Sequence, residues 1–331
     1  WRCCSGELAT TRPETMLGDT AVAINGEDPR YAHLHGCHVV LPLLNKEIPI
    51  VCDEHADMTK GTGVVKITPA HDPNDYAMGQ THDLPQINIF DEHAVVVDGY
   101  GEFSGMNRDE AREAIVAWFE EHGLLDHIED LDHSVMHCYR CDSALEPWLS
   151  EQWFVAVDKL KERATQVVRD GEIKFHPARW TDTYLTWMDN LKDWCISRQL
   201  WWGHRIPVFY CEDCGWEDAL TEDTDVCPKC GGHHIHQDEN VLDTWFSSQL
   251  WTFATQGWPD DTSELAEHHP TKVLVTARDI IALWVARMVM SSLYFLDEVP
   301  FKDVVIYPTI LAKDGSRMSK SKGNGVDPMD L

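Results

Sequence analysis

Two pairs of cysteines, Cys211-x-x-Cys214 and Cys227-x-x-Cys230, constrain the fold of this chain more than any other feature. Each pair has the spacing of a metal knuckle, and a glycine follows each pair where a tight turn is needed. Four thiolates complete the coordination of a tetrahedral zinc ion, so no position is left open for catalysis. The pattern predicts a structural zinc knuckle over residues 208–236, with reduced and unmetallated cysteines as the alternative.

The other cysteines indicate a reducing environment. The chain has 11 Cys in 331 residues, and a chain of this length does not need disulfides to stabilise its core. We therefore expect a cytoplasmic protein. Cys138-x-x-Cys141 is a third pair, which would be half of a second zinc site if its partners lie before residue 1; Cys3 and Cys4 are poorly spaced to serve. The histidines at 233–236 are expected on the surface rather than on a metal.

The charge balance excludes some classes of function. With 27 basic and 56 acidic residues, the formal charge is −29, which argues against a general nucleic-acid binder because phosphate neutralisation needs clustered Lys and Arg. A local basic track on a solvated acidic surface remains compatible with this charge. No apolar run approaches the roughly 18 residues that a membrane span needs, so we do not expect a membrane protein.

The first third of the chain has the pattern of a β domain. Short apolar runs at 21–24, 38–41, 48–51 and 64–67 are separated by Gly, Pro and Asp turns. This spacing favours a barrel-like β domain. A helix is predicted after it, with Asn107 as N-cap, an apolar face that includes Ala111 and Ile115, and Gly123 as its end.

The second half of the chain alternates helices and strands. A helix is predicted from about Val155 to Arg169, strands at 273–276 and 304–306, and an apolar helix from Ile280 to about Leu296. The segment Asp193–Pro207 is predicted to be a helix that runs into a strand. Such alternation indicates a doubly wound parallel sheet, whose ligands bind beyond the carboxyl ends of its strands.

A loop rich in Gly and Lys at 313–325 carries the most specific motif. Its hydroxyls and cations are able to close over a triphosphate and stabilise charge as pyrophosphate leaves, although composition alone would favour an ordinary basic surface loop. Arg317-Met-Ser-Lys-Ser321 resembles the KMSKS signature of the class I aminoacyl-tRNA synthetases, with Arg in place of the first Lys. The resemblance implies that Lys320 is the lysine that stabilises the transition state. The ATP-binding residues that it implies are Arg317, Met318, Ser319, Lys320 and Ser321.

Three neighbouring segments, Asp193–Pro207, Asn240–Ser248 and Val275–Met288, are similar to the valine-specific branch of the same family. The resemblance implies the second half of a Rossmann-type catalytic domain that uses ATP, with Mg²⁺, to activate valine. The residues implied to form the amino-acid pocket are Trp245, Ile280, Trp284 and Asp279. The alternative for both tryptophans is packing in the core, and a small apolar pocket is compatible with both roles.

A second constellation lies in Gly61–Asp75 and Ala9–Asp19. Strand alternation places Lys66 and Thr68 on one face, and Asp72 and Asp75 follow in the adjoining turn. Carboxylates, a lysine and hydroxyls around a cleft are able to hold an ammonium group, accept from a hydroxyl and place a water. From the chemistry alone, solvated turn aspartates are the favoured alternative.

Both strings resemble the editing domain of the valine, isoleucine and leucine branches, and are closest to the valine branch. The resemblance implies hydrolysis of threonine from mischarged threonyl-tRNA(Val), by attack of water on the ester without a metal or a covalent intermediate. The catalytic residues are then Asp72 and Asp75, and the residues that line this site are Arg12, Lys66, Thr68, Asp72 and Asp75. One departure is Lys60, which stands where the branch usually has Phe.

The expected organisation is an α/β multidomain chain: an editing domain at 1–135, a return connection with helices at 136–190, and half of the catalytic domain at 191–331. The sequence contains no HIGH motif and no anticodon-binding domain. We therefore expect an internal fragment that does not aminoacylate tRNA(Val) alone. The full-length enzyme is expected to be a monomer. The alternatives are a freestanding editing hydrolase, which has no use for a KMSKS-like loop, and a zinc-knuckle RNA-binding module, which the charge disfavours.

Overall fold

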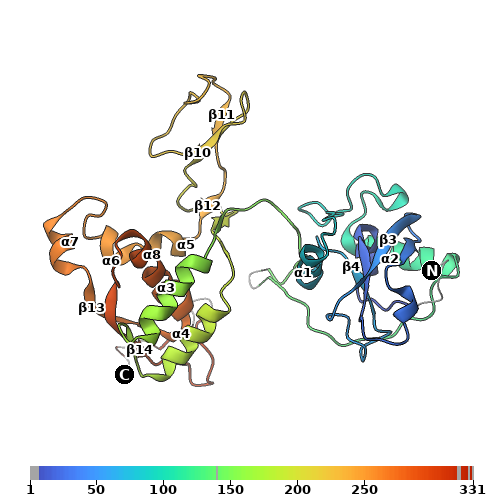
Figure 1. Cartoon of the computed structure of the whole chain (residues 1–331), viewed down its shortest axis with the longest axis horizontal. Coiled ribbons are helices and arrows are strands. Elements are labelled where there is room, and N and C mark those ends of the chain that lie inside the picture. The colour runs from blue at the N-terminus through green and yellow to red at the C-terminus, as the bar shows by residue number, and fades with distance from the viewer. Residues whose placement is uncertain (1–6, 139–140, 319–321, 327–328, 330–331) are drawn as a thin grey trace. The chain divides into compact units, whose positions relative to one another are not determined.

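In the computed structural model, the structure describes residues 7–138, 141–318, 322–326 and 329. The chain divides into two compact units, unit 1 (Trp1–Glu151) and unit 2 (Gln152–Leu331) (Figure 1). Within the described residues, every helix falls short of the length and hydropathy that a membrane-spanning helix needs.

Unit 1 combines a small sheet with two α-helices and short 3₁₀ turns. Its strands are β1 (Ala21–Ile24), β2 (His38–Leu41), β3 (Lys46–Cys52) and β4 (Val64–Ile67). Its helical elements are η1 (Pro13–Gly18), η2 (Ala32–Leu34), α1 (Pro73–Thr81), η3 (Gly101–Phe103) and α2 (Arg108–Glu121). The four strands lie where the apolar runs of the sequence predicted them.

The sheet of unit 1 is mixed, with the order β2-β3-β1-β4. The central strand β1 pairs with β3 in parallel, with Val22 opposite Ile50, and with β4 antiparallel, with Val22 opposite Lys66. All four residues of β1 are buried, as expected for a continuous apolar strand that is covered on both faces. The described strands form an open sheet and not the closed barrel that the sequence predicted, because β2 and β4 end the ladder at its two edges.

Helix α2 begins and ends close to the predicted limits. The side chain of Asn107 accepts from the N–H groups of Asp109 and Glu110, and Glu110 in turn accepts from the N–H of Asn107. This capping box satisfies donors that the first turn of a helix leaves unpaired. Ala111 and Ile115 are fully buried and pack with Leu17, Ile89 and Phe90.

Unit 2 contains a parallel sheet, several helices and a separate strand lobe. Its strands are β5 (Phe154–Val155), β6 (Lys174–His176), β7 (Trp194–Cys195), β8 (Ser197–Arg198), β9 (Val208–Cys211), β10 (Glu217–Ala219), β11 (Ile235–Gln237), β12 (Val241–Leu242), β13 (Thr271–Ala277) and β14 (Phe301–Tyr307). Its helical elements are α3 (Asp158–Arg169), α4 (Arg179–Asp189), α5 (Thr244–Ser248), α6 (Trp251–Ala254), α7 (Ser263–His268), η4 (Arg278–Ile280), the π turn η5 (Ile281–Val285) and α8 (Ala286–Phe295).

The parallel sheet has the order β13-β14-β6, with Leu274 opposite Val304 and Val304 opposite Phe175. Helix α8 connects β13 to β14, which makes one strand–helix–strand unit of the kind that the alternating pattern predicted. One apolar core joins the sheet to α3, α4 and α8, and Tyr184 and Phe301 are fully buried in it. The sheet is parallel, as expected, and the doubly wound arrangement stays a prediction.

The prediction of a helix within Asp193–Pro207 was wrong. The segment forms the short strands β7 and β8 instead, which pair with β5 and β12. Trp194 and Ile196 are buried on either side of the half-buried Cys195, an alternation that fits the strand β7 rather than a helix. Beyond them, β9, β10 and β11 form a lobe that projects from the helices of unit 2 (yellow in Figure 1).

The capping box of α2 gives a testable expectation. Asn107→Ala removes the side-chain acceptor for two N–H groups, so we expect about 1 kcal/mol of local stability to be lost. Hydrogen exchange of the Asp109 and Glu110 amides measures this loss. Asn107→Ser keeps an accepting oxygen and is expected to exchange close to the wild-type rate; equal acceleration in both variants would contradict the assignment.

Candidate functional site

A buried charged cluster lies at the end of β4 in unit 1. The Nζ of Lys66 is 3.3 Å from Oδ1 of Asp19 and also donates to Oγ1 of Thr68. The Thr68 hydroxyl donates to the same Asp19 oxygen at 2.6 Å. The exposed fractions of Asp19, Lys66 and Thr68 are 2 %, 8 % and 0 %. These residues therefore form the floor of the candidate site rather than the surface that a ligand would touch.

Burial governs the protonation of this floor. It raises the pKa of Asp19 to about 6, against the attraction of Lys66 and the hydrogen bonds from Thr68 and Lys66. Burial also raises the pKa of Asp75, and the N–H of Thr68, which donates to Asp75 at 2.8 Å, opposes that rise. The two carboxylates share the positive charge of Lys66, so each makes it harder for the other to ionise.

Asp72 and Asp75 lie at the start of α1, not in the turn that the sequence predicted. Oδ1 of Asp72 accepts from the N–H groups of Asn74, at 2.7 Å, and Asp75, at 3.2 Å, so Asp72 is the N-cap of the helix. Unpaired N–H groups and the helix dipole favour carboxylates at this end. Asp75 is buried whereas Asp72 is half-buried, so Asp72 is the carboxylate of this pair that borders solvent.

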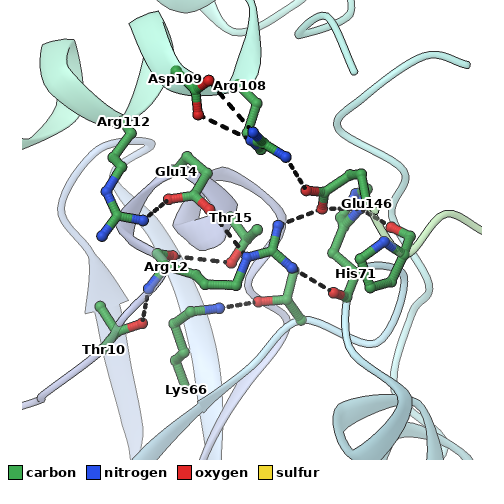
Figure 2. Close-up of polar contacts among 12 residues, drawn as sticks. Thr10, Arg12, Glu14, Thr15, Lys66, His71, Arg108, Asp109, Arg112 and Glu146 are labelled. Atoms are coloured by element: carbon green, nitrogen blue, oxygen red, sulfur yellow. Dashed lines mark hydrogen bonds and ion pairs between the residues drawn. The ribbon is translucent and has the colours of Figure 1, made fainter. Parts of the chain in front are cut away.

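Arg12 stands beside this cluster and joins three segments of unit 1 (Figure 2). Its Nε donates to Glu14 at 3.0 Å, its Nη1 donates to the carbonyl oxygen of His71 at 2.9 Å, and its Nη2 donates to Glu146. The carbonyl of His71 immediately precedes Asp72, so the structure brings Arg12 next to the start of α1. All five residues predicted for this site thus come together from η1, β4 and α1.

Of the two glutamates that hold Arg12, Glu14 is buried and Glu146 is half-buried, and both lie close to arginines of α2. Glu14 is 2 % exposed and its Oε2 is 3.4 Å from Nη1 of Arg112. Oε2 of Glu146 lies 3.8 Å from Nη1 of Arg108. Burial raises the pKa of Glu146, and the hydrogen bond from Arg12 opposes that rise. Figure 2 shows the resulting chain of alternating arginines and glutamates.

His71 is a buried neutral histidine rather than a proton donor at the surface. Its Nδ1 is 3.0 Å from the carbonyl oxygen of Pro147, and its Nε2 accepts from the N–H of Ile89 at 3.0 Å. A neutral ring with its proton on Nδ1 satisfies both contacts. Burial lowers the pKa of His71 to about 4, so this form holds at neutral pH.

Sequence reasoning missed Asp19, His71 and Glu146 as members of this cluster. Asp19 and His71 fall inside the two quoted motifs, but nothing local separates a buried charge from a solvated one. Glu146 lies 134 residues from Arg12 along the chain, and no spacing rule connects positions that far apart. A pairing argument was available for Asp19, since Lys66 near a strand end needs a carboxylate partner when it is buried.

In unit 2, the motif loop meets the end of β13. Nη2 of Arg317 donates to Oδ1 of Asp279 at 2.8 Å, so the structure brings together the predicted ATP loop and the predicted pocket. Asp314 accepts from the N–H and the hydroxyl of Ser316 at 3.0 and 2.7 Å, which closes a tight turn at Gly315. Gly315 has a φ of 78°, a conformation that favours glycine. Ser319, Lys320 and Ser321 lie outside the described residues.

The predicted pocket tryptophans lie on neighbouring elements of unit 2. Trp245 is on α5 and Trp284 is in the π turn before α8, and both are half-buried against the core. Ile280 is also half-buried. The indole N–H of Trp284 donates to the carbonyl oxygen of Ser248 at 3.0 Å, which joins the two elements. π turns occur frequently at functional sites, where they re-aim side chains. Core packing and a pocket wall both remain compatible with this geometry.

Behind these tryptophans lies a polar cluster that the sequence did not reveal. Asp243, the N-cap of α5, accepts from the indole of Trp194 at 3.0 Å and from Arg198 at 2.7 Å. The guanidinium of Arg287 stacks on Trp194 with its Cζ 3.9 Å from the ring centroid. Burial lowers the pKa of Arg287 to about 10, and the charge of Asp243 opposes that effect. Cation–π contact and this carboxylate together make a buried guanidinium tolerable.

The four knuckle cysteines converge. The Sγ atoms of Cys211, Cys214, Cys227 and Cys230 all lie within 4.8 Å of one another. Cys211 and Cys230 are 3.7 Å apart at sulfur, and Cys214 and Cys227 are 3.8 Å apart. A tetrahedral ion with metal–sulfur bonds of about 2.3 Å requires sulfurs roughly 3.8 Å apart. The thiolates therefore fit zinc, and the predicted ligand set is also the only metal-ligand cluster found among the described residues.

Cys138 and Cys141 lie in a turn closed by the N–H of Asp142 donating to the carbonyl of Cys138 at 2.8 Å. They belong to no group of three or more metal-ligating side chains within the part of the chain that the structure describes. The second zinc site therefore stays a prediction, and Cys3 and Cys4 lie outside the described residues.

Comparison with known proteins decides the family. A sequence profile described as "tRNA synthetases class I (I, L, M and V)" matches residues 14–331. The chain belongs to this family. Valine–tRNA ligases of Thermotoga maritima and Carboxydothermus hydrogenoformans are each 55 % identical over 324 residues, which is 98 % of this chain and 38 % and 37 % of those proteins. This synthetase chain thus spans less than two-fifths of the length of these relatives.

A ternary complex of an Agrobacterium radiobacter K84 LeuRS with tRNA and LeuAMS is a more distant likeness. It aligns at 18 % identity with a TM-score of 0.39, over 97 % of this chain and 40 % of that one. A likeness at this level supports no statement about the synthetase chain described above.

The buried Asp19 predicts a pH dependence of stability. Its pKa in the folded state, about 6, lies above the ordinary 3.8, so folding favours the protonated form. The contribution of Asp19 to stability therefore rises as the pH falls from about 7 to about 4. The free energy of unfolding of the wild type, minus that of Asp19→Asn, is expected to increase by roughly 1–3 kcal/mol over this range.

Urea denaturation of both proteins at each pH measures that difference. The pKa of His71, lowered to about 4, has the opposite effect, because stability is lost as the pH falls through it. His71 is present in both proteins, so its titration cancels in the difference. A difference that stays constant with pH would contradict a raised pKa for Asp19.

Proposed function

We propose that this chain is part of a valine–tRNA ligase, and that its unit 1 hydrolyses threonine from mischarged threonyl-tRNA(Val). The whole protein would activate valine with ATP and Mg²⁺ and transfer it to tRNA(Val). It would act in the cytoplasm as a monomer. The identity of 55 % to valine–tRNA ligases over 98 % of the chain supports the assignment to valine.

The observation that supports the editing proposal is the hydrogen bond from Arg12 to the carbonyl of His71, the residue before Asp72, beside the buried floor of unit 1. Arg12 has five N–H groups. Within the described residues, three of them donate to Glu14, the carbonyl of His71 and Glu146, so two remain for a ligand. Asp72 uses only Oδ1 as the helix cap. A cation and a carboxylate that belong to one site are suited to an ester oxygen and to the ammonium group of an amino acid.

A second site has a physical reason. Threonine and valine are nearly isosteric, and an apolar pocket rejects the extra hydroxyl only about 10²-fold, a known value for valine-specific synthetases. A polar site instead selects the error, since it gains a hydrogen bond to the hydroxyl that valine lacks. Hydrolysis adds water across the ester, which releases threonine and restores the free hydroxyl of the tRNA. Asp72 and Asp75 would place the water, and Lys66 and Thr68 would fix Asp75.

Unit 2 has features expected of one half of a nucleotide-binding sheet. Strand β13 pairs along one edge only among the described residues, and its Val273 and Val275 are 53 % and 59 % exposed. The unpaired edge is a surface that a further strand covers, and the two valines, which project from one face of the sheet, form a surface that a helix covers. Asp279 and Arg317 meet at the carboxyl end of this strand, where doubly wound sheets bind ligands. We place valine against Trp245, Ile280, Trp284 and Asp279, and ATP against residues 317–321 with Lys320 as the catalytic lysine.

We propose the domain order given by the limits 1–135, 136–190 and 191–331, with the first unit extended to residue 149. The contact between the return segment and Arg12, through Glu146, adds that the editing unit needs residues beyond 135 for its complete set of contacts. Lys60, 83 % exposed at its side chain and 3.7 Å from Asp57, stands apart from the floor residues, and its effect on editing stays a prediction.

We also propose that the knuckle holds one structural zinc ion. Cys214→Ser removes one of four thiolates, so we expect bound zinc to fall from about one per chain to less than about a fifth, with the lobe of β9–β11 destabilised. Elemental analysis after dialysis measures zinc, and Cys52→Ser is the matched control because Cys52 is exposed and lies outside the cluster. Full zinc content in Cys214→Ser would contradict the assignment.

Deacylation by the purified chain tests the editing proposal. Asp72→Asn removes the charge but keeps a good helix cap, so α1 is expected to stay intact while hydrolysis of threonyl-tRNA(Val) falls on the order of 10–100-fold. The assay follows release of threonine from threonyl-tRNA(Val) and of valine from valyl-tRNA(Val).

The exposed Asp98→Asn is the matched control and is expected to hydrolyse at the wild-type rate. Equal hydrolysis of both aminoacyl-tRNAs, or none by the wild-type chain, would contradict the proposal. An unchanged rate in Asp72→Asn would remove Asp72 from the site.

A further inference from the structure

Four consecutive residues of the segment that leaves unit 1 dock against the rest of that unit. Glu146 contacts Arg12, and the carbonyl of Pro147 is 3.0 Å from Nδ1 of His71. The indole of Trp148 donates to the carbonyl of Phe90 at 3.0 Å, and the carbonyl of Leu149 accepts from the amide of Asn88 at 2.8 Å. We call residues 146–149 the strap.

Glu146 is the charged member of the strap, and its side chain is only 11 % exposed. A carboxylate at this depth loses hydration, and the loss is tolerable only when cations are close. Arg12 donates to Oε1 of Glu146, and Arg108 lies 3.8 Å from Oε2. No other residue of the strap carries a charge, so the electrostatic contact between the strap and the site depends on this side chain.

Glu146 completes the restraint of the Arg12 guanidinium. Glu14 holds Nε and the carbonyl of His71 holds Nη1, while Glu146 holds Nη2 (Figure 2). A planar guanidinium held at all three nitrogens has one orientation, whereas loss of one acceptor frees rotation of the group about its stem. The two N–H groups that remain then keep a fixed direction only while the strap is docked.

We propose that Glu146 is a positioning residue of the editing site, which fixes Arg12 so that its two remaining N–H groups meet the acyl oxygen of the aminoacyl ester. This inference rests on the function proposed above for unit 1. Glu146 does not touch the substrate; it acts through Arg12. The strap therefore belongs to the site, although it follows the sheet and helices of unit 1 in the sequence.

The test compares Glu146→Gln with Glu151→Gln in the full chain. Glu151 is exposed and lies two residues beyond the strap, so the same substitution there is the matched control. Glu146→Gln is expected to lower kcat for threonyl-tRNA(Val) hydrolysis about tenfold or more while KM changes less than about threefold, because a neutral amide oxygen holds the Arg12 guanidinium less firmly than a carboxylate does. Glu151→Gln is expected to match the wild type.

A double-mutant cycle separates positioning from general destabilisation. In an Arg12→Ala background, Glu146→Gln is expected to cause no further loss of rate, because its effect acts through Arg12. If Glu146→Gln fails to fold, Glu146→Asp replaces it, with the charge kept and the side chain one methylene shorter; an intermediate loss of kcat is expected. An additive loss in the Arg12→Ala background, or a wild-type kcat in Glu146→Gln, would overturn the inference.

A second readout does not require activity. Modification of arginines by phenylglyoxal, resolved by mass spectrometry, reports how accessible Arg12 is. We expect Arg12 to react at least about threefold faster in Glu146→Gln than in Glu151→Gln or the wild type. If the wild-type chain hydrolyses nothing, the proposed function fails, but faster modification still supports the contact; unchanged modification overturns it.

Discussion

A guanidinium that is partly withdrawn from water needs acceptors, and the acceptors of Arg12 lie on three segments that are far apart in the sequence. Glu14, the carbonyl of His71 and Glu146 each take one of its nitrogens, and this requirement brings η1, the start of α1 and the strap to one place. The adjacent floor of Asp19, Lys66 and Thr68 follows the same rule, since each buried charge there has a partner. Charge pairing therefore positions the residues of the candidate site as much as sheet formation does.

Unit 2 solves a similar problem with aromatic rings and one carboxylate. Asp243 caps α5 while it accepts from Trp194 and Arg198, and Arg287 stacks on the same tryptophan. This arrangement connects β7, β8, α5 and α8 behind the side chains assigned to the amino-acid pocket. In the knuckle lobe, β9 is largely buried whereas β10 and β11 bury little, and the four cysteines converge there.

Elements with a local signal were predictable. Strand β1 follows a continuous apolar run, and β4 follows a run interrupted only by Lys66. Helix α2 follows from the cap at Asn107 and an apolar face at helical spacing. Contacts between distant segments were not: Glu146 reaches Arg12 across 134 residues, and Asp193–Pro207 pairs with strands on both sides that its own pattern does not reveal. The four-cysteine cluster was predictable because two Cys-x-x-Cys pairs indicate directly which side chains come together.

The most direct test of the central claim, that Arg12 and Asp72 border a site for a threonyl ester, is binding of a non-hydrolysable ligand. The amide analogue of 3′-threonyl-adenosine is titrated into the purified chain by calorimetry, beside the valyl analogue. The account predicts saturable binding of the threonyl analogue, at least about tenfold tighter than the valyl one because only threonine offers a hydroxyl to the site. Equal affinity for the two analogues, or no binding of either, would contradict it.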